Sequence, residues 1–104
     1  MTGLMASEEL IIDLHGYRVL RGGVPVMLSY REYALLVYLA THAGHVVSKR
    51  RLLEEGMGRH DIGGLRMVDE HIRRLKTKLE LGSRVVIEAE GDGYRFVTAS
   101  AVLT

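Results

Sequence analysis

Aliphatic residues recur at helical spacing in the second half of the chain, at Leu65, Val68, Ile72, Leu75 and Leu79. Steps of three and four residues, at about 100° per residue, gather these side chains into one stripe, which predicts a helix over 65–80 with the stripe in the core. The opposite side of this helix carries Arg66, Met67, Glu70, Arg73, Arg74 and Thr77, with His71 and Lys78 on one flank. An arginine presents a planar fork of donors suited to phosphates or guanine edges, so the face is a candidate for binding nucleic acid.

Two further helices are predicted upstream of this segment. Ser29 and Glu32 have the spacing of a capping box before an apolar stretch, which predicts a helix from Ser29 to about His42 that ends at Gly44. Ser48 caps a second, shorter helix that carries Leu52 and Leu53, with Lys49, Arg50 and Arg51 in its first turn. Those three cations form a second candidate for phosphate contact, and the polar, glycine-rich residues 56–64 are expected to be a loop.

Short β-strands are predicted at both ends of the chain. The runs 10–14, 17–20 and 24–28 are separated by glycine turns and predict a small antiparallel sheet, with Pro25 at a strand start or on an edge. After the helices, the runs 85–89 and 94–97 flank the segment 90–93, which predicts a β-hairpin. The expected fold class is α+β.

Composition favours one globular domain. The chain has 104 residues, of which 47% are hydrophobic, and its longest apolar run, Ala34–Ala40, is far shorter than the roughly 20 residues that span a bilayer. The absence of cysteine suits a reducing compartment, and Glu8 and Glu9 stand where a signal peptide is apolar, so we expect a cytoplasmic protein with no membrane partner. Residues 1–9 are expected to be a linker remnant or disordered tail, and residues 10–104 the domain.

The charge is concentrated in the middle of the chain. Residues 45–84 contain 10 basic and 6 acidic residues, whereas the remainder contains 4 basic and 7 acidic residues. A basic region between acidic flanks is typical of a surface that binds a polyanion, although charged runs also occur as plain solvated surface.

Three stretches, VVSKRRLLEEGMG, RMVDEHIRRLKTKLE and GDGYRF, closely resemble the effector domain of the OmpR/PhoB family of bacterial response regulators, and the capped stretch SYREYALL matches its first helix. The resemblance covers residues 10–97. It implies a winged helix-turn-helix with a small N-terminal sheet, a three-helix core and a C-terminal hairpin wing. It also implies that the third helix enters the major groove of DNA, that the wing reaches the minor groove, and that the loop before the third helix faces RNA polymerase.

Carried over by position, the resemblance implies a DNA-binding role for individual residues. It places Arg66, His71 and Arg73 near phosphates, with Lys76 as a further phosphate contact. It places Met67, Glu70 and Arg74 against base edges, and it directs the Tyr94 hydroxyl to the DNA backbone. The full candidate set adds Thr77, Lys78, Lys49 and Arg50, while Asp69 is expected to pair with Arg66 or Arg73 along the helix.

The chain departs from the family pattern in the wing and in the loop. Glu88, Glu90 and Asp92 make the wing acidic where the family commonly has a basic residue, so the wing either stands off the duplex, contacts protein, weakens binding or is plain solvated surface. Met57 takes the place of a frequent tryptophan, which bears on the proposed polymerase contact. The receiver domain of full-length members is absent from these 104 residues.

These observations predict sequence-specific binding of double-stranded DNA in transcription regulation, with two copies on direct repeats and a monomer in the absence of DNA. The alternative is a winged-helix module for protein contact, which would use the acidic wing and the Met57 loop. An enzyme is not expected, because no nucleophile, base and orienting group occur together, and His60 and Asp61 do not make a metal site by themselves. No cofactor or metal is expected.

Overall fold

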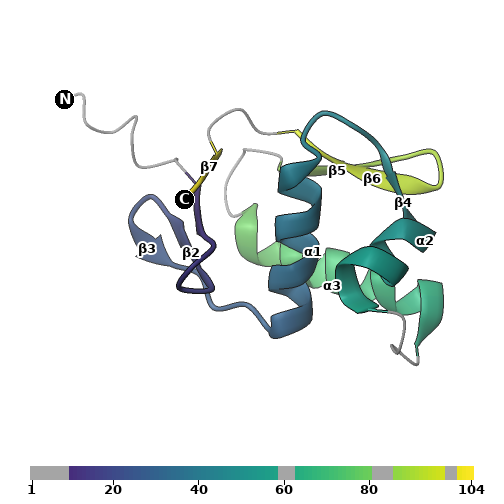
Figure 1. Cartoon of the computed structure of the whole chain (residues 1–104), viewed down its shortest axis with the longest axis horizontal. Helices are drawn as coiled ribbons and strands as arrows, with labels where there is room; N and C mark the ends of the chain where they lie inside the picture. Colours follow the sequence, from purple (N-terminus) through teal and green to yellow (C-terminus); the bar gives the residue numbers. More distant parts are fainter. Residues whose placement is uncertain (1–9, 59–62, 81–85, 98–100) are drawn as a thin grey trace.

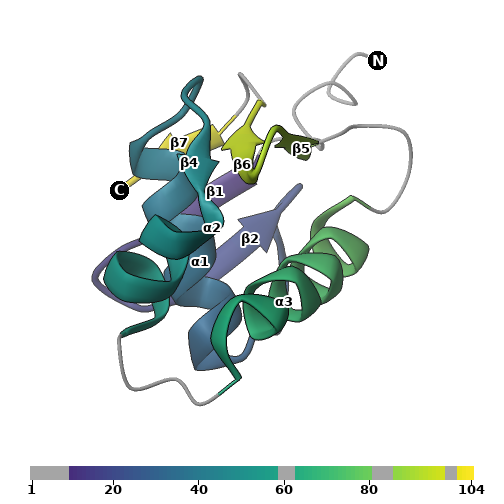
Figure 2. The ribbon, with the colours of Figure 1, turned by 90° about the vertical axis from the view of Figure 1, so that its right-hand side faces the viewer.

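The computed structural model describes residues 10–58, 63–80, 86–97 and 101–104, in which helices pack between two small sheets (Figure 1). Helices α1 (Tyr30–Thr41) and α3 (Gly64–Leu79) cross in the middle of the molecule in the view of Figure 1 and lie next to each other in Figure 2. The core between them holds Leu35, Leu36 and Leu39 of α1 and the aliphatic stripe of α3. The expected tail, residues 1–9, lies outside the described residues.

The N-terminal sheet has the strand order β3 (Val24–Pro25), β2 (Arg18–Arg21), β1 (Leu10–Asp13) and β7 (Ala101–Leu103). The first three strands are antiparallel as expected, and Pro25 lies in an edge strand, where its missing N–H leaves no ladder bond unmade. The predicted antiparallel sheet is therefore confirmed for these three strands, and β7, which was not expected, adds to β1 in the parallel direction. This pairing joins the two ends of the described chain, and no local pattern signals it.

The first helix follows its capping signal. The Ser29 hydroxyl accepts a hydrogen bond from the Glu32 N–H at 3.2 Å, and the Glu32 carboxylate accepts one from the Ser29 N–H at 2.9 Å. The helix is capped by His42, and Gly44 follows at a φ of 86°, which favours glycine. The predicted start and end of this helix are therefore confirmed.

The second helix is longer than expected and changes type. Strand β4 (Val47–Ser48) leads into α2 (Lys49–Arg51), with Ser48 as the cap, and the chain continues as a π-helix, η2 (Leu52–Gly58). The prediction of a loop from Gly56 is wrong at its start. The backbone hydrogen bonds of a π-helix connect residues that are five positions apart, so residues 52 and 57 lie one above the other on the same side. Leu52 and Met57 both face inward on this side and are buried. Gly56 lies close to Leu35 and Tyr38 of α1.

Helix α3 agrees with its periodicity to within one residue at each end. Val68, Ile72, Leu75 and Leu79 are at most 1% exposed, which confirms the stripe as core. Leu65 is the exception at 40% exposure, because it lies in the first turn of α3, where other elements cover the stripe less completely.

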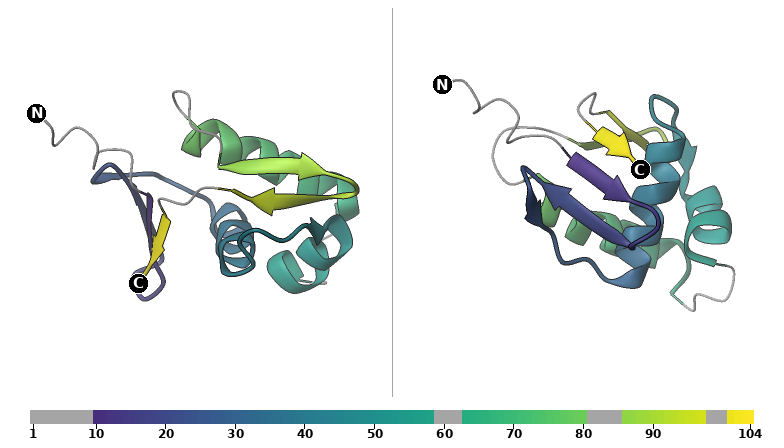
Figure 3. Two further views of the ribbon diagram at one scale, coloured as in Figure 1. Left: turned by 90° about the horizontal axis from the view of Figure 1, so that it is seen from above. Right: turned by 60° about the vertical axis from the view of Figure 1, so that its left-hand side comes forward.

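The C-terminal hairpin consists of β5 (Ile87–Glu90) and β6 (Gly93–Phe96), joined by a turn in which Gly91 has a φ of 59°. The predicted hairpin is confirmed, and β4 pairs with β6 to make a three-stranded sheet that was not expected. The hairpin lies beside α3 (Figure 3, left). With α2, η2 and α3 before it, the hairpin completes a winged helix-turn-helix of the α+β class, as predicted.

Candidate nucleic-acid interface

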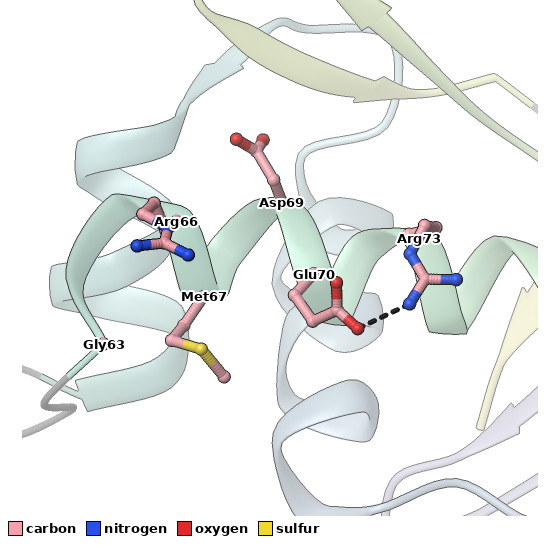
Figure 4. Close-up of a pocket in the computed structure, with 6 residues that line it drawn as sticks. All are labelled: Gly63, Arg66, Met67, Asp69, Glu70 and Arg73. Carbon is pink, nitrogen blue, oxygen red and sulfur yellow. Dashed lines mark hydrogen bonds and ion pairs between the residues drawn. The ribbon is translucent and has the colours of Figure 1, made fainter.

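The solvent face of α3 carries the side chains that the helical pattern places there. Arg66, Arg73, Arg74 and Thr77 are exposed, while Met67 and Glu70 are half-buried. Figure 4 shows Arg66, Met67, Glu70 and Arg73 along one side of the helix, around a shallow hollow that Gly63 and Asp69 also line. The other side of α3 is packed in the core, and this packing fixes the direction in which the solvent face points.

Glu70 binds two of the arginines. Its Oε2 accepts hydrogen bonds from Nη2 of Arg73 at 2.5 Å and from Nε of Arg74 at 3.1 Å. The Arg73 hydrogen bond, together with the nearby positive charges of both arginines, lowers the pKa of the Glu70 carboxyl. Thr77 donates its hydroxyl hydrogen to the carbonyl of Arg73, one turn earlier. The central part of the face is therefore an ordered cluster of two cations and one anion.

Asp69 joins three elements rather than pairing within its helix. Its carboxylate accepts a hydrogen bond from the Tyr94 hydroxyl at 2.6 Å and lies 3.1 Å from the Nζ of Lys49. The expected pairing with Arg66 or Arg73 is wrong, because the β4–β6 pairing brings the start of α2 and the first residues of β6 together over Asp69. Lys49 and Tyr94 are directed toward this carboxylate instead of standing free for DNA.

The three groups perturb one another. The hydrogen bond from Tyr94, together with Lys49, lowers the pKa of Asp69. Burial and the Asp69 carboxylate raise the pKa of the Tyr94 hydroxyl to about 12. Both shifts favour the ionised carboxylate and the neutral phenol, which is the state in which the hydrogen bond forms.

Lys78 also points to another part of the molecule. Its Nζ lies 2.6 Å from Oε1 of Glu32, whose side chain is 3% exposed at the start of α1. Burial raises the pKa of Glu32, but the hydrogen bonds from Lys78 and Ser29 outweigh it, and the net effect lowers the pKa. The crossing of α3 over α1 directs the ammonium group toward Glu32, a contact that was not expected from the sequence, and the DNA-binding role of Lys78 stays a prediction.

His71 is buried rather than exposed on the flank. It is 8% exposed, and within the described ranges its Nδ1 has no hydrogen-bond partner. The physical reason is its position three residues after Val68 and four before Leu75, which turns the ring toward the core side of α3. The expectation of an exposed flank position is therefore wrong for this side chain, while its contact with phosphate stays a prediction.

Two other expected phosphate contacts remain near the surface. The Arg50 side chain is 70% exposed, with its Nη1 3.7 Å from a carboxylate oxygen of Glu54. Lys76 lines a groove between α3 and the wing, together with Asp69, Ile72, Arg73, Thr77, Ala89 and Tyr94.

The acidic wing contains its own counter-charge. Arg95 lies 3.4 Å from Glu88 and 2.9 Å from Glu90, and the strand register puts Glu88 directly opposite Arg95. The sequence prediction did not include Arg95. The alternation of charges across the hairpin is the signal that would have identified it, because residues paired across neighbouring strands lie close together.

Met57 is 9% exposed, so its side chain is packed inside the domain, and the expected contact of its loop with RNA polymerase stays a prediction. Among the residues that the structure describes, no group of three histidine or acidic side chains is arranged to hold a metal ion. None of the helices in the same ranges is both long and apolar enough to cross a bilayer.

Comparison with known proteins places this geometry among transcription regulators. Residues 23–96 match the family described as "Transcriptional regulatory protein, C terminal". The phosphate regulon transcriptional regulatory protein PhoB of Escherichia coli K12 is 38% identical over 102 residues, which cover 90% of this chain and 44% of PhoB. The chain thus spans less than half of that relative.

Solved structures agree with the sequence comparison. The C-terminal DNA-binding domain of RstA from Klebsiella pneumoniae is 36% identical with a TM-score of 0.74, and the match covers 88% of this chain and 86% of that domain. The RstA DNA-binding domain in complex with the RstA box is 35% identical with a TM-score of 0.71, over 83% of this chain and 88% of the other.

Proposed function

This chain belongs to the OmpR/PhoB family of response-regulator C-terminal effector domains, and on that premise we propose that it binds double-stranded DNA sequence-specifically to regulate transcription. The observation that carries the proposal is the exposed face of α3, where Arg66, Arg73 and Arg74 project from a helix whose other side is buried. The major groove of DNA, about 12 Å wide, admits one α-helix. A related domain, that of RstA, is known in complex with its DNA box.

Within this function we assign different tasks to the exposed side chains. Arg66 and Arg73 contact phosphates at the edge of the groove, with Lys76 and Arg50 as outlying phosphate contacts. Arg74 and Met67 face base edges. Three further side chains act within the domain, because each donates a hydrogen bond to a carboxylate. Lys49 and Tyr94 donate to Asp69 of α3, and Lys78 donates to Glu32 of α1.

The proposal extends to the assembly on DNA. Two copies occupy a direct repeat in the bacterial cytoplasm, and the surface around η2 contacts RNA polymerase through its exposed residues rather than through buried Met57. Selection of duplexes from a randomised library by the purified domain tests the arrangement, because two copies on a direct repeat would enrich a repeated motif.

Salt dependence tests the phosphate contacts. If about 4 to 6 phosphates are contacted, the logarithm of the binding constant should fall with the logarithm of salt concentration at a slope of about −4 to −5. Arg73→Ala should weaken binding to selected and random duplexes alike and reduce the slope by about 1, whereas Arg74→Ala should lose about 1 to 3 kcal/mol on the selected duplex only. Fluorescence anisotropy measures both quantities.

Lys78→Ala is the matched control, since it removes one positive charge from the same helix, but one that is paired with Glu32 of α1. Its salt slope should equal that of the unmodified domain at a temperature where circular dichroism shows it folded. The absence of saturable binding at physiological salt would refute the proposal and favour the alternative, a winged-helix module for protein contact.

A further inference from the structure

The arrangement of Glu70 between two arginines has a consequence for which base pairs the domain selects. Resting on the proposed function, we propose that Glu70 is a specificity-determining residue: one of its carboxylate oxygens orients Arg73 and Arg74, and the other accepts a hydrogen bond from the N4 amino group of cytosine. The proposal concerns the choice of base and not the existence of DNA binding.

The two oxygens of Glu70 are used unequally. Both arginines bind Oε2, and no residue in the described ranges forms a hydrogen bond to Oε1. The side chain is 32% exposed and lies on the solvent side of α3, beside the hollow (Figure 4). A half-exposed, ionised oxygen on the face that meets the groove needs a donor there, since water is excluded when the duplex binds.

The bases differ in what they offer this oxygen. In the major groove guanine presents two acceptors and thymine an acceptor and a methyl group, so both repel or ignore a carboxylate. Adenine presents a donor beside an acceptor, whereas cytosine presents its N4 donor. A carboxylate therefore favours cytosine, the partner that Glu and Asp side chains use in the groove.

Arg74 is oriented so that it complements this choice. It binds Glu70 through Nε, which leaves its two terminal nitrogens for the O6 and N7 acceptors of guanine. Holding the guanidinium groups in place before binding reduces the conformational entropy lost when the complex forms. The same carboxylate reduces the summed charge of the three side chains from +2 to +1, which weakens their sequence-independent attraction to phosphate. A cytosine adjacent to a guanine is thus the expected reading of this cluster.

Site selection from randomised duplexes provides the test, with the unmodified domain, Glu70→Gln and Glu70→Ala compared side by side. The unmodified domain should select cytosine at one position next to a guanine, with about 5- to 150-fold preference over the other bases. Glu70→Gln should move that single position toward adenine, which an amide binds through N6 and N7. Glu70→Ala should lose preference there and gain affinity for random DNA.

Glu54→Gln is the charge-matched control, because it also removes one carboxylate that faces an arginine, Arg50 at 3.7 Å, but on η2 instead of α3. It should leave the selected sequence unchanged. If both Glu70 variants select the same sequence as the unmodified domain, the inference is overturned while the proposed function stands. If the unmodified domain selects no sequence at all, the proposed function itself fails.

Discussion

Asp69 shows how one residue couples the recognition helix to the rest of the domain. Its carboxylate accepts hydrogen bonds from the Tyr94 hydroxyl of the wing and from the Lys49 ammonium group at the start of α2. Because these partners lie on two different elements, the carboxylate sets the position of the wing relative to α3. In the complex with DNA that we propose, the position of the wing in turn decides how closely the wing approaches the duplex.

Replacing Tyr94 with Phe should therefore destabilise the domain by about 1 to 2 kcal/mol, since a hydrogen bond to a charged group is lost. The effect should depend on pH. The folded-state pKa of Tyr94 is raised from about 10 to about 12, so its contribution is fully present below pH 10 and is lost as the pH rises toward 12. Urea unfolding at pH 8, 10 and 11.5 should show the difference between the two proteins shrinking with pH.

Tyr30→Phe is the control for this experiment, because Tyr30 is 77% exposed and its hydroxyl is not part of the Asp69 cluster. Its unfolding free energy should equal that of the unmodified domain at every pH. A Tyr94→Phe difference that stays constant up to pH 11.5 would contradict the assigned hydrogen bond.

At the scale of elements, the wing depends on close contact between β6 and β4. A Cβ added at Gly93 would lie 2.0 Å from the carbonyl oxygen of Val47, an approach that only glycine allows. The pairing of Ser48 with residue 93 is therefore possible only because glycine has no side chain there. The same contact brings Lys49 and Tyr94 to Asp69, so a change that separates β4 from β6 should also break the hydrogen bonds to Asp69.

We expect Gly93→Ala to destabilise the domain by about 2 to 4 kcal/mol, because either β4 or β6 must move. Gly91→Ala is the matched control in the same hairpin. It has open space around its Cβ but a φ of 59°, so it should cost only about 1 kcal/mol of backbone strain. Equal losses for the two variants in thermal or urea unfolding would show that the β4–β6 approach does not limit stability.

At the scale of the whole molecule, the parallel pairing of β7 with β1 closes the N-terminal sheet. The Leu14 N–H donates to the carbonyl of Thr104 at 2.9 Å, and the Thr104 N–H donates to the carbonyl of Ile12 at 3.0 Å. Ala101 and Leu103 pack against the core from this strand. The end of the described chain is thus part of the domain and lies beside β1 (Figure 1).

Removing residues 101–104 should lower the unfolding free energy by about 2 kcal/mol, because a partly buried leucine and the β1 ladder bonds are lost. The salt slope of DNA binding should not change, since α3 keeps its contacts. Val102→Ala, at a side chain 40% exposed on the same strand, should be nearly neutral. A shortened protein as stable as the full chain in urea unfolding would contradict the role of β7.

Local signals in the sequence were sufficient for most of the architecture. The capping box at Ser29, the stripe from Val68 to Leu79 and the glycine turn at Gly91 each act over a few residues, so α1, α3 and the hairpin could be predicted from spacing alone, whereas the π-helical η2 could not. The exposed arginines of α3 follow from the same spacing, because burying the stripe directs the opposite side to solvent.

Contacts between distant residues were decided only by tertiary structure. Asp69 lies 20 residues from Lys49 and 25 from Tyr94, and Lys78 lies 46 from Glu32. A charged side chain pairs with whichever opposite charge the packing brings near, and periodicity within one helix carries no information about a second helix or strand. For that reason the sequence identified the solvent face of α3 that we propose for DNA binding, but only the packing of α1, α2 and the wing against α3 determined which charged side chains are bound within the domain.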